Sequence, residues 1–183
     1  MRRINNKKGQ VWVETVIYTL IGLAIMGLIL AGAKGPIDRR RDTIVIEQSI
    51  ESMGNINEKI YEVQRATGNR RAVDLKIGSG KVIFDMANSS IIWEIESSFE
   101  YSELDERIPY GTVDVLTEIG SPYKVSLIMS YPAINFKYEE RTSGQHELFT
   151  SPMPYQILIE NMGTGSGVCE GDDNKLCIEF REV

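Results

Sequence analysis

Few side chains in this sequence could carry out catalysis or hold a metal ion. The 183 residues include one histidine, His146, and two cysteines. A single histidine excludes most metal sites and most Ser-His-Asp or Cys-His arrangements, and we expect His146 to lie at the surface. The sequence has no nucleophile elbow, no zinc-protease motif and no recognisable frame of paired carboxylates. We therefore predict no catalytic residue, no cofactor and no metal site, and a protein that is not an enzyme.

The two cysteines form a close pair near the C-terminus. Cys169 and Cys177 enclose the segment EGDDNKL. In an extracellular protein this even pair is typical of a disulfide that closes the tip of a hairpin. Metal ligation is the less favoured alternative because there is no second pair. The run Asp172-Asp173-Asn174 lacks the spaced oxygen ligands of a calcium loop, so we interpret it as a solvated turn.

Two further motifs could bind or be modified. Asn88-Ser89-Ser90 is an N-glycosylation acceptor sequence, and it lies where we expect a turn between two strands. Such short patterns also occur by chance, so both interpretations stay open. Gly163-Thr164-Gly165-Ser166-Gly167 superficially suggests a phosphate loop, but no lysine follows it at the required spacing and no helix pattern opens after it. A flexible turn is the better interpretation.

Any functional side chain must be positioned by the elements around it, and the dominant element is hydrophobic. The stretch from Val11 to Ala33 is 23 residues long and contains one acidic residue, Glu14. A helix of that length can cross a bilayer. It is too long for the apolar core of a secretory signal peptide. A plain membrane anchor would leave Glu14 unexplained, because a carboxylate in the bilayer is costly.

The start of the chain resembles a known targeting signal. The string KKGQVWVETVIYTLIGLAI, after a basic leader with four Lys and Arg residues, resembles the class III signal peptide of archaeal type IV prepilins. The resemblance covers about 30 of the 183 residues. It implies that a prepilin peptidase cuts between Gly9 and Gln10, which makes Glu14 the fifth residue of the mature chain. Archaellins usually have glycine at that position, so Glu14 favours a pilus.

The resemblance also implies a role for Glu14 in assembly. When subunits leave the lipid and pack helix to helix, the Glu14 carboxylate can pair with the new amine of Gln10 on a neighbour. Two compensated charges in a dry core cost far less than one. In the alternative, Glu14 stays near the lipid headgroups without a role. Small residues along the helix either let neighbouring helices approach closely or are tolerated without a role: Gly22, Gly27, Ala31 and Gly32.

Charge constrains orientation and partners. Basic residues lie on both sides of the hydrophobic segment, but Asp38 and Asp42 are interleaved with those behind it. We therefore place the N-terminus inside the cell and the rest of the chain outside. Without the four basic residues of the leader, the formal net charge falls from −6 to −10. Such an acidic surface argues against nucleic acid as a partner.

The rest of the chain predicts an α+β fold. Apolar residues recur at spacings of three and four over 37–67, after an expected kink or melted turn at 34–36, which indicates an amphipathic helix that packs under a globular domain. Residues 68–183 alternate in short segments, which is typical of an antiparallel β-sandwich. We expect a hairpin of 72–77 with 81–85, and strands over 90–96, 113–118, 123–131, 155–160 and 176–181. The segment 132–154 is expected to be a long loop with at most one strand. The core candidates are Trp93, Phe99, Leu116, Leu127 and Ile157.

These expectations divide the chain into a cleaved signal peptide (1–9), an N-terminal helix (10–67, with 10–33 in the membrane or filament core) and an extracellular head domain (68–183). By the resemblance, the protein is a structural subunit of an archaeal type IV pilus-like surface filament, used for adhesion. Its partners are then copies of itself or other pilins, the prepilin peptidase, an assembly ATPase and a membrane platform protein, with the membrane before assembly. The alternative is a single-pass, membrane-anchored binding or sensing protein that does not polymerise.

Overall fold

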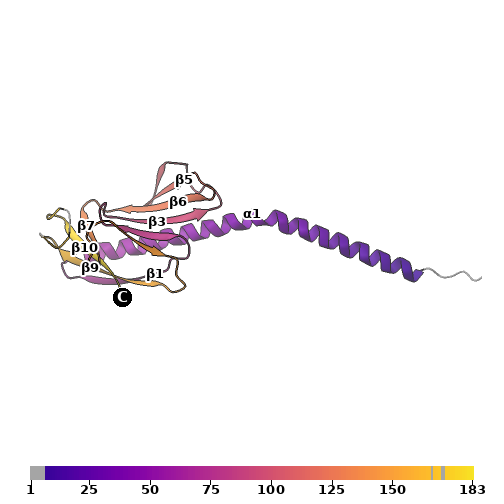
Figure 1. Ribbon diagram of the computed structural model, residues 1–183, viewed down its shortest axis with the longest axis horizontal. Coiled ribbons are helices and arrows are strands. Elements are labelled where there is room, and N and C mark those ends of the chain that lie inside the picture. The colour runs from indigo at the N-terminus through magenta and orange to yellow at the C-terminus, as the bar shows by residue number, and fades with distance from the viewer. Residues whose placement is uncertain (1–6, 166, 170–171) are drawn as a thin grey trace, which may run out of the picture. The chain divides into compact units, whose positions relative to one another are not determined.

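The computed structural model describes residues 7–165, 167–169 and 172–183. One long helix is followed by a domain rich in β-sheet (Figure 1). The chain divides into two compact units, one that ends at Arg40 and one that runs from Arg41 to Val183. The second unit contains every strand together with the C-terminal part of the helix. The expected α+β class is confirmed.

Helix α1 (Lys7–Val63) has no break of the kind that the sequence suggested. It is a continuous α-helix of 57 residues with Pro36 inside it, so the melted turn expected at 34–36 is wrong. Proline removes one backbone donor, but the bonds of the flanking turns persist and hold the helix together. The helix ends at Val63 rather than at residue 67. Gly68 follows with a φ of 82°, and its amide donates to the carbonyl of Asn161 at 2.7 Å.

Ten strands form two sheets in the described part of the chain. They are β1 (Arg70–Leu75), β2 (Lys81–Asp85), β3 (Ser90–Ser97), β4 (Arg107–Tyr110), β5 (Val113–Glu118), β6 (Tyr123–Ser130), β7 (Ile134–Tyr138), β8 (Gln145–Phe149), β9 (Tyr155–Gly163) and β10 (Leu176–Glu182). The four-stranded sheet has the order β1-β9-β10-β7 and the six-stranded sheet the order β4-β5-β6-β3-β2-β8. The pairing of β10 with β7 is parallel, and the other strand pairs are antiparallel.

Several strands were predicted within a few residues of their bounds, but their partners were not. The expected hairpin of 72–77 with 81–85 is wrong, because β1 pairs with β9 and β2 pairs with β3 and β8. The segment 132–154 contains two strands, β7 and β8, rather than one at most. The short strand β4 was not expected. It pairs only with β5 and contains Pro109, and proline is tolerated at such a sheet edge.

One hydrophobic core joins the helix to both sheets within the second unit. The buried face of α1 carries Ile46, Met53, Ile56, Ile60 and Val63, which belong to the same cluster as buried residues of both sheets. Burying this face is what holds the C-terminal part of the helix against the strands. Hydrogen bonds add two attachments. Tyr131 Oη donates to Asn57 Oδ1 at 2.8 Å, and Asn161 Nδ2 donates to the carbonyl of Val63 at 2.9 Å.

The core candidates were partly right. Trp93, Leu127 and Ile157 are at most 1 % exposed, as predicted. Phe99 and Leu116 are only partly buried, so these two expectations are wrong. In β5 the buried side chains are those of Val113, Val115 and Thr117. Leu116 alternates with them and therefore points to the opposite face of the sheet.

Each sheet carries a continuous row of ion pairs across its strands, which we call an ion-pair ladder. In the four-stranded sheet the ladder runs Lys137–Glu179 (3.2 Å), Glu179–Arg181 (2.9 Å), Arg181–Glu160 and Glu160–Arg70 (2.7 Å). In the six-stranded sheet it runs Glu147–Lys81 (2.7 Å), Lys81–Glu94 (3.5 Å), Glu94–Lys124 (2.7 Å) and Lys124–Glu118 (3.4 Å). Opposite charges on neighbouring strands support the pairing and its register.

Candidate functional site

The apolar part of α1 is the most unusual surface of the protein. Every side chain described between Trp12 and Gly32 is exposed. The exposed fractions reach 77 % at Trp12 and 75 % at Leu28. The mean hydropathy of the most apolar 18-residue window is 2.3, and none of that window is buried. By length and composition this helix could cross a membrane, and it could equally pack against other apolar helices.

Glu14 lies on this apolar part of α1, and its side chain is exposed. The hydroxyl of the nearby Thr19 has a partner within the helix, because its Oγ1 donates to the carbonyl of Thr15. Among the described residues, no basic side chain forms an ion pair with Glu14. In an apolar environment this carboxylate would be costly to bury without a cationic partner.

The expected processing site is only partly described. Gly9 and Gln10 lie in the first turns of α1, but nothing is described of their side chains. Residues 1–6 of the expected leader lie outside the described residues. Cleavage between Gly9 and Gln10 therefore stays a prediction.

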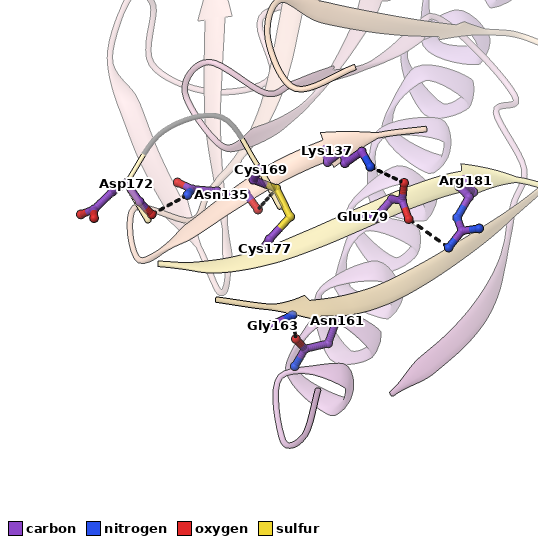
Figure 2. Close-up of a disulfide and its surroundings, with 9 residues drawn as sticks. All are labelled: Asn135, Lys137, Asn161, Gly163, Cys169, Asp172, Cys177, Glu179 and Arg181. Carbon is purple, nitrogen blue, oxygen red and sulfur yellow. Dashed lines mark hydrogen bonds and ion pairs between the residues drawn. A yellow bond between two sulfur atoms is a disulfide. The ribbon is translucent and has the colours of Figure 1, made fainter. Parts of the chain in front are cut away.

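The expected disulfide is confirmed. Cys169 and Cys177 are joined, with their Cα atoms 5.8 Å apart. Figure 2 shows Asn135, on the neighbouring strand β7, beside the disulfide and Asp172. Its Nδ2 donates to the carbonyl of Asp172 at 2.8 Å, and its own carbonyl lies 3.8 Å from Cys169 Sγ. Residues Asp172, Asp173 and Asn174 are exposed, which agrees with the expected solvated turn.

The glycosylation candidate lies at an accessible turn. Asn88 is exposed between β2 and β3, and its Nδ2 donates to Asp85 Oδ2 at 3.0 Å. Burial alone would raise the pKa of Asp85, but hydrogen bonds from Gln145 and Asn88 outweigh it and lower that pKa. Ser90, the third residue of the motif, is buried. Modification of Asn88 stays a prediction.

The only histidine is not a surface residue, so that expectation is wrong. His146 is half-buried, and its ring stacks on the ring of Tyr138 with centroids 3.9 Å apart and an interplanar angle of 22°. Burial lowers the pKa of His146. Its Nε2 and the Tyr138 Oη have no hydrogen-bond partner among the described residues. The unexpected strand β8 explains the difference, because it turns His146 to the same side as the buried Leu148.

The described residues contain no group of three or more His, Cys, Asp or Glu side chains that could hold a metal ion. They do contain a surface feature that the sequence analysis missed. Tyr101, Ser102, Glu103, Ile108, Tyr110 and Val115 line a hollow of about 290 Å³, which we call the tyrosine–acid hollow. The sequence feature that could have indicated this hollow is the segment 98–106, which contains four acidic residues and no Lys or Arg.

Comparison with protein families, with curated proteins and with solved structures finds no match to this chain. The properties of the candidate site therefore come from the chain itself. It has an exposed apolar helix with one carboxylate near its start, and this helix is continuous with the core of a disulfide-bonded β domain.

Proposed function

We propose that this chain is the precursor of a structural subunit of a type IV pilus-like surface filament of archaea, with a role in adhesion. The helix α1 spans the cytoplasmic membrane, with the basic leader inside the cell and the β domain outside. A prepilin peptidase removes the leader after Gly9. The subunits then leave the lipid and pack through α1 into a filament, driven by an assembly ATPase and its membrane platform protein.

The observation that carries the proposal is the apolar, exposed part of α1 with Glu14 near its start. This surface cannot stay in water, because burying apolar area stabilises by about 25 cal/mol per Å². Lipid covers it before assembly, and neighbouring helices cover it afterwards. Glu14 then pairs with the amine that cleavage creates on Gln10 of another copy, which fixes the axial register of the bundle.

The resemblance of residues 7–25 to a class III signal peptide supports the same function. A basic leader, a Gly-Gln pair, a glutamate five residues into the mature chain and an uninterrupted apolar helix occur together in the required order. The alternative, a membrane-anchored binding or sensing protein, uses the same helix but needs neither the cut nor the carboxylate.

The test changes Glu14 in the full chain, produced in its own host. Glu14→Leu should remove filaments from the cell surface, or leave them few and disordered in electron micrographs. Glu14→Asp keeps the charge and should restore them in part. In both variants the protein should still fractionate with the cells, because the helix is still apolar. Mass spectrometry of the sheared material should report a chain that begins at Gln10.

Three results would contradict the proposal. Surface material whose first residue is Met1 would show that the leader is not removed. A wild-type chain that forms no polymer would favour the monomeric anchored protein. A Glu14→Leu chain that forms as many filaments as the wild type would show that assembly does not depend on the Glu14 carboxylate.

A further inference from the structure

The tyrosine–acid hollow lies on the β domain, at the end where α1 enters it. The amide of Ser98, just before the acidic segment, donates to Asp42 Oδ2 at 2.8 Å. Burial raises the pKa of Tyr101, and the charge of Glu47 on α1 raises it further. Both interactions place the hollow beside the first residues of the unit that begins at Arg41.

The lining of this hollow is suited to a cationic and apolar partner. Tyr101 and Ile108 supply partly exposed aromatic and apolar surface, and Tyr110 is 58 % exposed. Four exposed carboxylates lie in the adjoining segment, on Glu100, Glu103, Asp105 and Glu106. None of them forms an ion pair with a described residue, although Arg107 follows directly. Tyrosine rings and carboxylates together are the groups that bind guanidinium, by stacking and by paired hydrogen bonds.

The chain itself carries a surface of the matching kind. Arg41 and Ile44 are three residues apart in α1, within the unit that begins at Arg41, so they share one helix face, which we call the isoleucine–arginine face. Ile44 is 53 % exposed, in contrast to Ile46 and Met53, which are fully buried. Arg41 is exposed. It forms no ion pair with any described residue of the unit from Arg41 to Val183.

We infer that the tyrosine–acid hollow of one copy receives the isoleucine–arginine face of a second copy. This inference rests on the proposed function, since it names a contact between subunits of the filament. Arg41 lies against the tyrosine rings and the carboxylates, and Ile44 covers Ile108. The charges are complementary, whereas an anionic lipid surface would repel the four carboxylates. A second copy is therefore favoured over the membrane as the occupant.

The size of the hollow fits a contact that works only in a polymer. A hollow of about 290 Å³ accommodates a few side chains, which is too small an interface to hold two free molecules together. Each subunit of a filament repeats the contact while α1 already keeps its neighbours close, so weak contacts add up. The pair of surfaces then selects which neighbour the head contacts.

The experiment reverses the charge of each surface in the full chain, in the native host. E103R/E106R makes the rim of the hollow basic, and R41E makes the helix face acidic. Each variant alone brings like charges together and should lower the yield of sheared filaments by about tenfold or more. Producing both variants in the same cells should restore the yield, because the basic hollow of one chain receives the acidic face of the other. E139R/E140R, which reverses two exposed acids on another loop, is the matched control and should assemble as the wild type does.

Each outcome decides between the alternatives. If either single variant assembles normally, or if the mixture does not recover, the contact is not between copies and the inference is overturned while the filament itself stands. If the wild type forms no filament, the proposed function fails and the inference fails with it. Thermal unfolding of each full-length variant in detergent micelles should match the wild type, because Arg41, Glu103 and Glu106 are all exposed. A loss of filaments accompanied by unfolding of the β domain would also count against the inference.

Discussion

The attachment of α1 to the β domain can be tested with two isoleucines on the same helix. Ile60 is fully buried in the common core, whereas Ile44 is 53 % exposed. Replacing Ile60 by alanine removes buried carbon atoms and leaves a cavity, which costs about 2 to 5 kcal/mol of unfolding free energy. The same change at Ile44 removes little buried area, and alanine favours the helix slightly, so the expected change is about 0.5 kcal/mol or less.

The assay is unfolding of the full chain in detergent micelles, followed by tryptophan fluorescence. Trp93 is 1 % exposed and reports the core of the β domain, whereas Trp12 is 77 % exposed on the apolar helix and serves as an internal reference. At about 3 °C per kcal/mol for a unit of this size, Ile60→Ala should lower Tm by about 6 to 15 °C. Equal shifts for the two variants would refute the conclusion that this half of α1 is part of the core of the domain.

Two further predictions concern the disulfide and the histidine. Cys169 and Cys177 are eight residues apart, so replacing both by serine should lower the free energy of unfolding by about 2.5 kcal/mol, from the loop entropy that the disulfide removes from the unfolded chain. Denaturant unfolding of the oxidised wild type and of the variant measures this difference. Equal unfolding midpoints would contradict the prediction. Burial keeps the folded-state pKa of His146 below its ordinary value, so the unfolded chain takes up this proton first as the pH falls. This contribution to stability is therefore complete above about pH 6.5 and is lost as the pH falls from there toward the lowered folded-state pKa. His146→Phe should make the free energy of unfolding less dependent on pH between pH 7.5 and pH 5.5. If the free energy of unfolding changes with pH as steeply as in the wild type, other groups cause the dependence.

Much of the helix and the strands could be predicted from the sequence because they are local. The spacing of apolar residues identifies the buried face of α1, and alternation locates strands such as β5 and β6. Continuity through Pro36 could not be predicted, because a single proline is both a helix breaker and a tolerated kink. Strands β7 and β8 were missed because both carry charged and polar residues and are flanked by prolines and a glycine, which weakens the alternation.

Strand partners depend on contacts that are distant in the sequence. Val73 and Ile83 are ten residues apart, yet they lie in different sheets. The backbone of β1 pairs with β9, and the backbone of β2 pairs with β3, so the two strands do not pair with each other. The tyrosine–acid hollow was missed for the same reason. Tyr101 and Val115 come from a loop and a strand that meet only in the folded domain. The disulfide was predictable because both of its cysteines lie in one short segment, with no other cysteine to compete.

The two ion-pair ladders have a consequence for the temperature at which the domain works. Removing charged groups from water becomes less costly on heating, while the gain from burying apolar area levels off. Networks such as Lys137–Glu179–Arg181 and Lys81–Glu94–Lys124 therefore contribute a growing share of the stability in hot surroundings. Dissolved salt screens the exposed ends of these networks. Heating therefore raises the share of the stability that the ion pairs contribute, whereas a high salt concentration lowers it.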